Sequence, residues 1–339
     1  MKRRNIAVFF DGTGQCRDYQ PSYNWTNVTF LYDAVDVRES DELVQTRKYL
    51  DGVGTREGES LEGGGFGIGL DKRIEEACSF LYQEFDIAFR KNQEPHVYLF
   101  GFSRGAFAAR WLASLLEFVG VSKGNPAPRK LFSVHKDQDV STARSYIESR
   151  DVWYPVKIDF MGLWDTVEAS VDEIRGIEKL PSCVEAAYHA LAIDEWRSTF
   201  KPTRFAKSDR VTEVWFPGCH SDVGGGYEIR TLANAPLDWM VEGCQKYGLA
   251  VDENALQEEL RKIKEMGVFH DELEHSILWR GLNLRDGYKG RYFRDIPSGD
   301  YIDASVARYG DTAPTDRRIL LDKCVVVNER TGNAIDNLC

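Results

Sequence analysis

The stretch that decides the fold is HVYLFGFSRGAFAAR, which runs from His96 to Arg110. It begins as an apolar run that is typical of a buried β-strand and ends as an alanine-rich segment that is typical of a helix. Between the two lie Gly101, Ser103 and Gly105, the three fixed positions of a Gly-x-Ser-x-Gly pattern. The residues therefore predict a strand, a sharp turn that carries the serine, and a helix.

This order predicts the nucleophile elbow of the α/β-hydrolase fold, in which a serine is held at a tight strand-to-helix turn. Small residues are needed around Ser103 because strand and helix approach closely there and the serine adopts a strained backbone conformation. An ordinary strand–turn–helix with a surface serine is the alternative. The elbow is favoured because the strand and the helix flank the motif on the correct sides.

Strands and helices alternate along the rest of the chain, which predicts a mostly parallel sheet with helices on both faces. Strands are expected over 5–10, 45–51, 96–102, 156–163, 212–216 and 324–327, and helices over 27–37, 71–90, 104–119, 183–193, 232–247 and 253–266. We expect one α/β-hydrolase domain over 1–339, with a helical or irregular cap or lid over 228–320. The glycine-rich stretch 63–69 lacks the lysine and hydroxyl residues of a phosphate-binding loop and is interpreted as a flap or wall of the site.

Composition restricts the partners of the chain. Its net charge of −11 over 339 residues argues against nucleic acid and against strong attraction to anionic membranes, while transient contact with a lipid surface through an apolar mouth stays open. The N-terminal apolar run is too short for a signal peptide or a membrane span, so the chain is expected in the cytoplasm as synthesised. Its seven cysteines are odd in number and lack Cys-x-x-Cys spacing, which fits a reducing compartment and predicts no metal site.

A serine hydroxyl attacks an ester only with the help of a base, and the base needs an acid that orients it and stabilises its charge. In this fold the chain order is serine, acid, histidine, each on a loop after a strand. Asp165 and His220 satisfy that order, since each follows an expected strand, at the edge where α/β sheets bind ligands. Asp222, two residues beyond His220, is an alternative acid or a residue that caps the turn.

An oxyanion hole needs two backbone N–H groups directed at the developing negative charge. One is expected from Arg104, which follows the serine, and the other from Gly12 or Thr13 in the loop after the first strand. Asp11 is expected to fix that loop, because a carboxylate that faced the oxyanion would oppose catalysis. His189 is expected on a helix among alanines, as a packing residue or a support for the site. This chemistry requires no metal and no organic cofactor.

Eight segments, in unbroken order from about residue 5 to residue 230, resemble one known family. They read FFDGTGQ (9–15), NVTFLYDAV (27–35), YLDGVGT (49–55), GGGFGIGLDKRI (63–74), FGFSRGAFAAR (100–110), GLWDTV (162–167), HALAIDEWRSTFKP (189–202) and VWFPGCHSDVGGGY (214–227). The family is an uncharacterised α/β-hydrolase domain family that includes the first family of type VI secretion lipase effectors. Together these segments are far more specific than the pentapeptide around the serine.

The resemblance implies a phospholipase or esterase with Ser103, Asp165 and His220 as its triad and a helical segment that covers the site. It also implies an immunity or delivery partner and delivery by a secretion system. The chain departs from the family at Asp303, where an Ile-His-x-Ser-Val motif often places a histidine. The long membrane-binding extension of the larger effectors is not found in this sequence, which leaves soluble esters open beside phospholipids.

The sequence thus predicts a serine ester hydrolase, lipolytic in type, that works through an acyl-enzyme. Two alternatives remain at this point. One is a degenerate hydrolase fold that binds a ligand or partner without turnover, and the other is an amidase or peptidase that uses the same triad. The acyl chain, the head group and the oligomeric state are not predicted.

Overall fold

The computed structural model describes residues 1–56, 59, 65–122, 153–168, 177–262, 265, 267–274, 276–309, 315 and 317–327. Its main strands are β1 (Lys2–Phe10), β2 (Arg38–Glu39), β3 (Leu43–Leu50), β4 (Gln93–Phe102), β7 (Ile158–Trp164), β8 (Ala187–Ala192), β9 (Val211–Phe216), β10 (Tyr301–Asp303) and β11 (Val325–Val327). Within these described ranges they form one nine-stranded sheet in the order β11-β10-β9-β8-β7-β4-β1-β3-β2. Neighbouring strands are parallel except for β2 and β3, so the predicted α/β architecture is confirmed.

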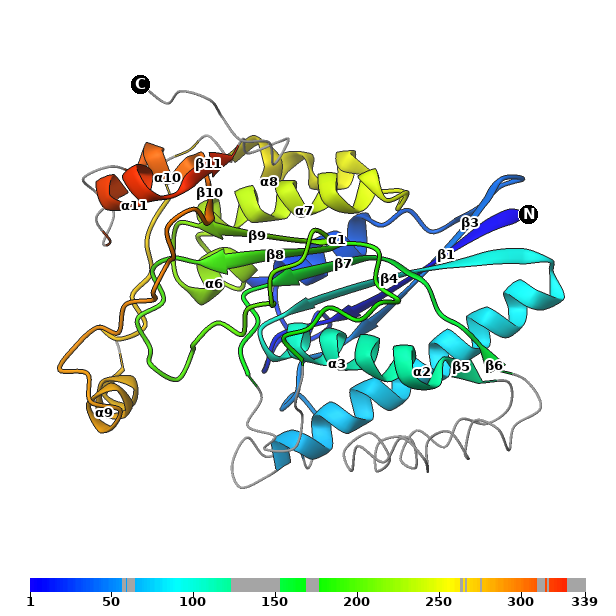
Figure 1. Ribbon diagram of the computed structural model, residues 1–339, viewed down its shortest axis with the longest axis horizontal. Helices are drawn as coiled ribbons and strands as arrows, with labels where there is room; N and C mark the ends of the chain where they lie inside the picture. The colour runs from blue at the N-terminus through cyan, green and yellow to red at the C-terminus, as the bar shows by residue number, and fades with distance from the viewer. Residues whose placement is uncertain are drawn as a thin grey trace.

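Helices cover both faces of this sheet (Figure 1). One face carries α2 (Gly65–Arg90) and α3 (Arg104–Val119), and the other carries α1 (Asn27–Ala34) and α7 (Asn234–Lys246). The shorter helices are α6 (His220–Gly224), α8 (Gln257–Arg261), α9 (Ile277–Arg285), α10 (Ser305–Arg308) and α11 (Arg317–Lys323). A small antiparallel pair, β5 (Val121–Ser122) and β6 (Trp153–Tyr154), lies outside the main sheet.

The central strands are apolar along their whole length because both faces of a parallel sheet are covered. In β1, Ile6 and Val8 point into the core beneath α2 and α3, while Ala7 and Phe9 point into the core beneath α1 and α7. All four side chains are fully buried. This continuous burial fixes the position of the carboxyl ends of the strands, where the candidate site lies.

The strand order reverses between β1 and β4. From β1 the chain goes to β3 on one side, and it then returns to β4 on the other side and continues outward through β7, β8 and β9. Open α/β sheets bind ligands outside the carboxyl ends of the strands at such a reversal. Here β1 leads into Asp11, β4 leads into Ser103 and β7 leads into Asp165, so the topology places these residues at one edge.

The expected helix over 183–193 is wrong, because the structure has strand β8 there, between β7 and β9. Its sequence AYHALA is buried at every position except Tyr188. An alanine-rich strand that is covered on both faces shows neither alternation nor β-branched residues, which are the usual signals of a strand. His189 therefore lies on a strand rather than on a helix.

Two shorter segments also differ from the expectation. The glycine-rich stretch is not a separate flap where it is described, since α2 begins at Gly65, six residues before the predicted start. Residues 63 and 64 lie outside the described residues. In place of one helix over 253–266, the chain forms a 3-10 turn (Glu253–Leu256) followed by α8, and residues 263, 264 and 266 also lie outside the described part.

The segment 228–320 contributes to the body of the fold as well as to its cover. Helix α7 packs on β7 and β8, and β10 pairs with β9 and β11. The part that contacts the loops after β7, β8 and β9 comprises residues 267–274 and 276–296, which we call the cap segment; its contacts are described below. Among the described helices, none combines the length and the apolar character that crossing a membrane requires.

Candidate active site

The serine of the elbow lies at the turn between β4 and α3. Ser103 has φ 58° and ψ −125°, a conformation that non-glycine residues rarely adopt. A Cβ at Gly101 would lie 2.5 Å from the carbonyl oxygen of Gly105, and one at Gly105 would lie 2.3 Å from that of Phe10. Both glycines are therefore required by the close approach of strand, helix and the neighbouring β1.

A histidine and a carboxylate are aligned with this serine. The Oγ atom of Ser103 lies 2.8 Å from Nε2 of His220, and Nδ1 of His220 lies 2.6 Å from Oδ2 of Asp165. The three residues come from the loop after β4, the first position of α6 and the residue after β7. All three are buried. The structure thus brings together, in one hydrogen-bonded line, three residues that are far apart in the sequence.

The carboxylate in this line has a second partner that the sequence did not reveal. Arg294 of the cap segment donates from Nη1 to Oδ1 of Asp165 at 2.6 Å and from Nη2 to Oδ2 at 2.9 Å. The backbone N–H of Ala192 also donates to Oδ1, at 3.0 Å. Burial raises the pKa of Asp165, but the charge of Arg294 and the hydrogen bond from His220 outweigh it, so the pKa lies well below its usual range.

The imidazole of His220 lies in an aromatic surrounding. Its ring centroid is 4.6 Å from that of Phe102 and 5.0 Å from that of Phe200, which meets it edge-on. Burial lowers the pKa of His220, and the hydrogen bond and charge of Asp165 offset this only in part, so the pKa stays below its ordinary value. The imidazole is therefore neutral at neutral pH, the form that accepts a proton.

The backbone at His220 is fixed by a buried ion pair. Its N–H donates to Oε2 of Glu195 at 3.2 Å. Arg197 donates to both oxygens of Glu195, at 2.9 and 2.7 Å, and its guanidinium lies over the Phe200 ring at 3.7 Å. A bidentate pair of this kind fixes orientation as well as charge. The loop after β8 thus holds the backbone of His220 and also positions Phe200, which packs against the His220 ring.

Asp222, the alternative acid, faces away from the line of hydrogen bonds. Its Oδ2 accepts the N–H of Cys219 at 3.0 Å, which caps α6, and its Oδ1 lies 2.6 Å from Nδ1 of His270 in the cap segment. Because Nδ1 of His220 is directed at Asp165, the geometry favours Asp165 over Asp222 as the acid. Asp222 acts as a cap and as an anchor for the cap segment.

Of the two candidates for the second oxyanion donor, the geometry is unfavourable to Gly12. Its N–H already donates to Oδ1 of Asp11 at 2.7 Å. That carboxylate also accepts hydrogen bonds from the hydroxyls of Thr26, Thr29 and Tyr49, so Asp11 is held inside the loop. This leaves Thr13 as the candidate, together with Arg104 at the first position of α3.

Two other residues considered from the sequence take supporting positions. Nε2 of His189 accepts the N–H of Thr166, the residue after Asp165, at 3.1 Å, and its Nδ1 lies 2.9 Å from Glu213. Asp303 ends β10, where its Oδ1 accepts the N–H of Ser305 at 2.9 Å. His189 therefore holds the turn that presents the acid, although it does not touch the serine.

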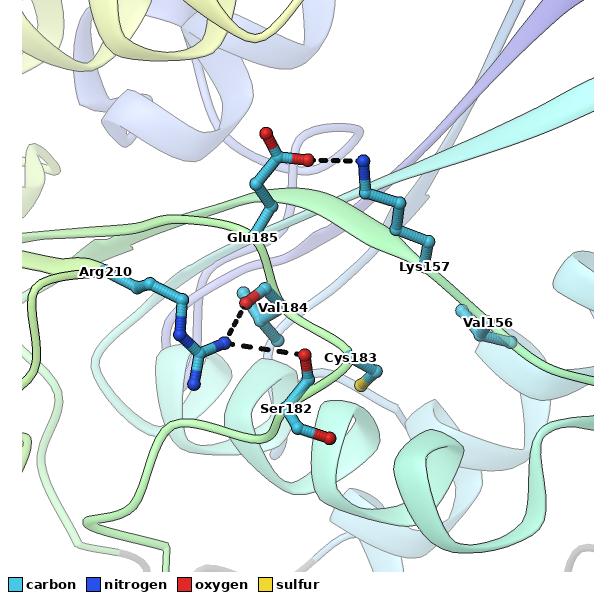
Figure 2. Close-up of a pocket in the computed structure, with 7 residues that line it drawn as sticks. All are labelled: Val156, Lys157, Ser182, Cys183, Val184, Glu185 and Arg210. Carbon is cyan, nitrogen blue, oxygen red and sulfur yellow. Dashed lines mark hydrogen bonds and ion pairs between the residues drawn. The ribbon is translucent and has the colours of Figure 1, made fainter.

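A separate pocket of about 430 Å³ opens at the amino-terminal ends of β7, β8 and β9, opposite the candidate site (Figure 2). Its polar side chains are engaged with neighbours: Arg210 donates to the carbonyls of Ser182 and Val184, and Lys157 pairs with Glu185 at 2.5 Å. The pocket has no nucleophile–base pair among its lining residues. The chemistry therefore belongs to the carboxyl edge of the sheet.

A serine raised on a nucleophile elbow at the reversal point of such a sheet places the protein among the α/β-hydrolases. Comparison with known families then narrows the class. A family model described as the catalytic domain of Tle1-like phospholipase effectors of the type VI secretion system (T6SS) matches residues 4–243. The chain belongs to this family, as the sequence motifs had indicated.

A yeast protein and a solved structure are among the individual proteins that are similar to the chain. The uncharacterized protein YEL023C of Saccharomyces cerevisiae is 31% identical over 248 residues, which are 62% of this chain and 34% of the yeast protein. The chain thus spans about a third of that relative. A solved structure of the Tle1 effector bound to the VgrG spike of the Type 6 secretion system shares the fold, with a TM-score of 0.50 and 16% identity. That similarity covers 87% of this chain and 82% of the effector chain.

Proposed function

We propose that this protein is a serine hydrolase that cleaves carboxylic ester bonds of lipids, with phospholipids as its substrate class. The observation that carries the proposal is the line of hydrogen bonds from Ser103 through His220 to Asp165. Membership of a family of phospholipase effectors supports the choice of a lipid ester. Soluble esters that share the acyl–oxygen bond are expected to react at the same serine.

The reaction follows from the positions of the three side chains. As Oγ of Ser103 attacks the ester carbonyl, Nε2 of His220 takes the serine proton, and a tetrahedral oxyanion forms. The imidazolium gives this proton to the departing alkoxide, which leaves as an alcohol and gives the acyl-enzyme. Water then attacks the acyl carbon while His220 takes its proton, and the carboxylic acid is released as the proton returns to Ser103.

Charge is stabilised at both ends of this line. Asp165, held ionised by Arg294, stabilises the imidazolium and keeps the ring in the tautomer that presents Nε2 to the serine. We assign the oxyanion to the backbone N–H groups of Arg104 and Thr13, because the start of α3 and the loop after β1 meet beside the serine. Removal of one such donor typically costs about 10²–10³-fold in kcat.

The domain organisation and the delivery of the protein are part of the same proposal. We propose a single α/β-hydrolase domain over 1–339 whose cover is the cap segment, and synthesis in the cytoplasm. The solved Tle1 effector is bound to a secretion spike, so a spike or immunity protein is a candidate partner. Because a yeast protein also matches, membership of the family does not by itself require such a partner; co-purification with the candidate partner tests it.

Labelling with a fluorophosphonate probe, read by intact mass, tests the mechanism. A single adduct on the wild-type protein that is absent from Ser103→Ala supports it. Ser114→Ala is the matched control, because this serine lies on α3 and its hydroxyl donates only to a carbonyl one turn back, that of Arg110. An adduct that persists in Ser103→Ala, or no adduct on folded wild-type protein, contradicts the mechanism.

A further inference from the structure

Helix α9 of the cap segment carries three apolar side chains that are exposed to solvent. Ile277 is 82% exposed, Leu278 66% and Leu284 62%. Ile277 and Leu284 are seven residues apart and therefore lie on one side of the helix, and Leu278 lies on the adjoining side. Exposed leucines are common singly, but three on one short helix form a patch.

The inward side of the same helix is held by polar contacts. Asn283, 1% exposed, donates to the carbonyls of Trp196 and Gly290 at 2.8 Å each and accepts the N–H of Ser198 at 2.8 Å. Trp279 also lies on this inward side. A helix on the surface of a globular protein normally directs polar residues outward, so three outward apolar residues on α9 are unusual. The outward apolar residues of α9 are thus not needed to hold it in place.

The net charge of α9 and of the loop that follows it is opposite in sign to that of the whole chain. Between residues 276 and 294 the sequence has five cationic residues and one acidic residue, Asp286, whereas the chain carries a net charge of −11. The cationic residues are Arg280, Arg285, Lys289, Arg291 and Arg294. Arg294 is buried against Asp165, and the other four are exposed. Arg285 pairs with Asp286 and Arg291 pairs with Asp271 at the surface. Arg280 and Lys289 lie beside Asp271 and Glu274, with no ion pair between them among the described residues. Apolar side chains rimmed by exposed cations match the chemistry of an anionic lipid surface.

The patch also lies over the candidate site. Trp279, on the inward side of α9, meets Phe200 edge-on at a centroid distance of 5.5 Å, and Phe200 in turn meets the ring of His220. A surface that accepted the outward side of α9 would therefore lie next to the cover of the site. Substrate molecules in that surface would be presented to the site at short range.

We propose that α9 and the loop to residue 293 form a docking surface for an anionic lipid bilayer. The apolar side chains of Ile277, Leu278 and Leu284 enter the interface, and Arg280, Arg285, Lys289 and Arg291 face the lipid phosphates and carboxylates. Such helices lie in the plane of the interface, and their binding depends on both apolar area and charge. The proposed function gives a reason for this docking, but binding to the bilayer does not itself require ester hydrolysis.

The test measures binding of the full chain, in the Ser103→Ala background, to vesicles of phosphatidylcholine with or without phosphatidylserine. We expect binding to the phosphatidylserine vesicles, weaker binding to neutral ones, and loss on raising the salt concentration. Replacing Ile277 and Leu284 by serine is expected to lower the partition constant about tenfold. Ile319→Ser is the matched control, since Ile319 is 58% exposed on α11, outside the cap segment.

Three outcomes overturn the docking surface. They are no binding to phosphatidylserine vesicles, an equal loss of binding in Ile319→Ser, and a concentration-dependent dimer that the double substitution abolishes without any lipid binding. Fluorophosphonate labelling separates this proposal from the one above. A protein that is labelled but does not bind vesicles keeps the hydrolase and loses the docking surface, and one that binds without being labelled does the reverse.

Discussion

Arg294 donates hydrogen bonds to both carboxylate oxygens of Asp165 from a loop 129 residues further along the chain. Neither side chain is exposed to solvent. Isolated charges at such a depth would be strongly unfavourable, so each is stable there because of the other. The ion pair therefore joins the cap segment to the acid of the proposed triad.

Replacing Arg294 by glutamine is expected to lower both stability and activity. Breaking a buried pair typically costs about 3–5 kcal/mol, and kcat on a soluble ester should fall about 10–100-fold. Loss of the positive charge beside Asp165 favours protonation of the hydrogen-bonded pair of Asp165 and His220. The acid limb of kcat/KM, which follows the proton on His220, should therefore also move to higher pH. Arg38→Gln, at an exposed pair with Asp36 outside the cap segment, should change none of these. An unmoved acid limb in Arg294→Gln would show a merely structural role.

The pH profile of the wild-type enzyme should follow the proton on His220. Since only the neutral imidazole can accept the serine proton, kcat/KM falls as the pH falls through the pKa of His220. Burial lowers that pKa from the ordinary value of about 6.5, so the midpoint of the acid limb is expected below pH 6.5. Stopped assays with a neutral ester across the pH range measure it, and a midpoint above pH 7 would be inconsistent with the buried site.

The two candidate acids can be separated by paired substitutions. Asp165→Asn should reduce kcat about 10⁴-fold, because the amide neither stabilises the imidazolium nor holds its tautomer. Asp222→Asn removes a helix cap and the contact with His270, so it should cost about 1 kcal/mol of stability and only a few-fold in kcat. Steady-state kinetics on both folded variants decide the matter, and a larger loss in Asp222→Asn would reverse the assignment.

The elbow glycine predicts a sharp difference between two alanine substitutions. In Gly105→Ala the new Cβ would lie 2.3 Å from the carbonyl oxygen of Phe10, so the variant should lose about 3 kcal/mol or more of stability. A Cβ at Gly281 on α9 meets nothing within 4 Å. There alanine should raise stability by about 0.5–1 kcal/mol. Urea unfolding of both variants tests this, and equal stabilities would mean that the elbow is looser than described.

The predicted site residues that the structure brings together are those that carry a local signal in the sequence. The elbow is marked by Gly101, Ser103 and Gly105 together with their flanking strand and helix. Asp165 and His220 each follow an apolar run, and the chain order of the fold could be applied to them. The structure puts the side chain of His220 within hydrogen-bond distance of both Ser103 and Asp165.

What the sequence missed has no local signal. Strand β8 is alanine-rich and covered on both faces, and β10 is three residues long inside an irregular region. Arg294 lies in a stretch without periodicity among other arginines, so nothing in the chain marks it as the partner of Asp165. The engagement of the Gly12 N–H by Asp11 likewise depends on a tertiary loop conformation.

The ion pair between Arg294 and Asp165 also limits how far the chain can be shortened from its C-terminal end. The family match ends at residue 243, inside α7, and it includes the serine, the histidine and both candidate acids. A fragment that ended at residue 243 would contain every motif of the proposed triad. It would lack Arg294, which pairs with the ionised Asp165, and His270, which contacts Asp222. The region that the family model covers is therefore shorter than the region that supplies the hydrogen-bond partners of the proposed triad.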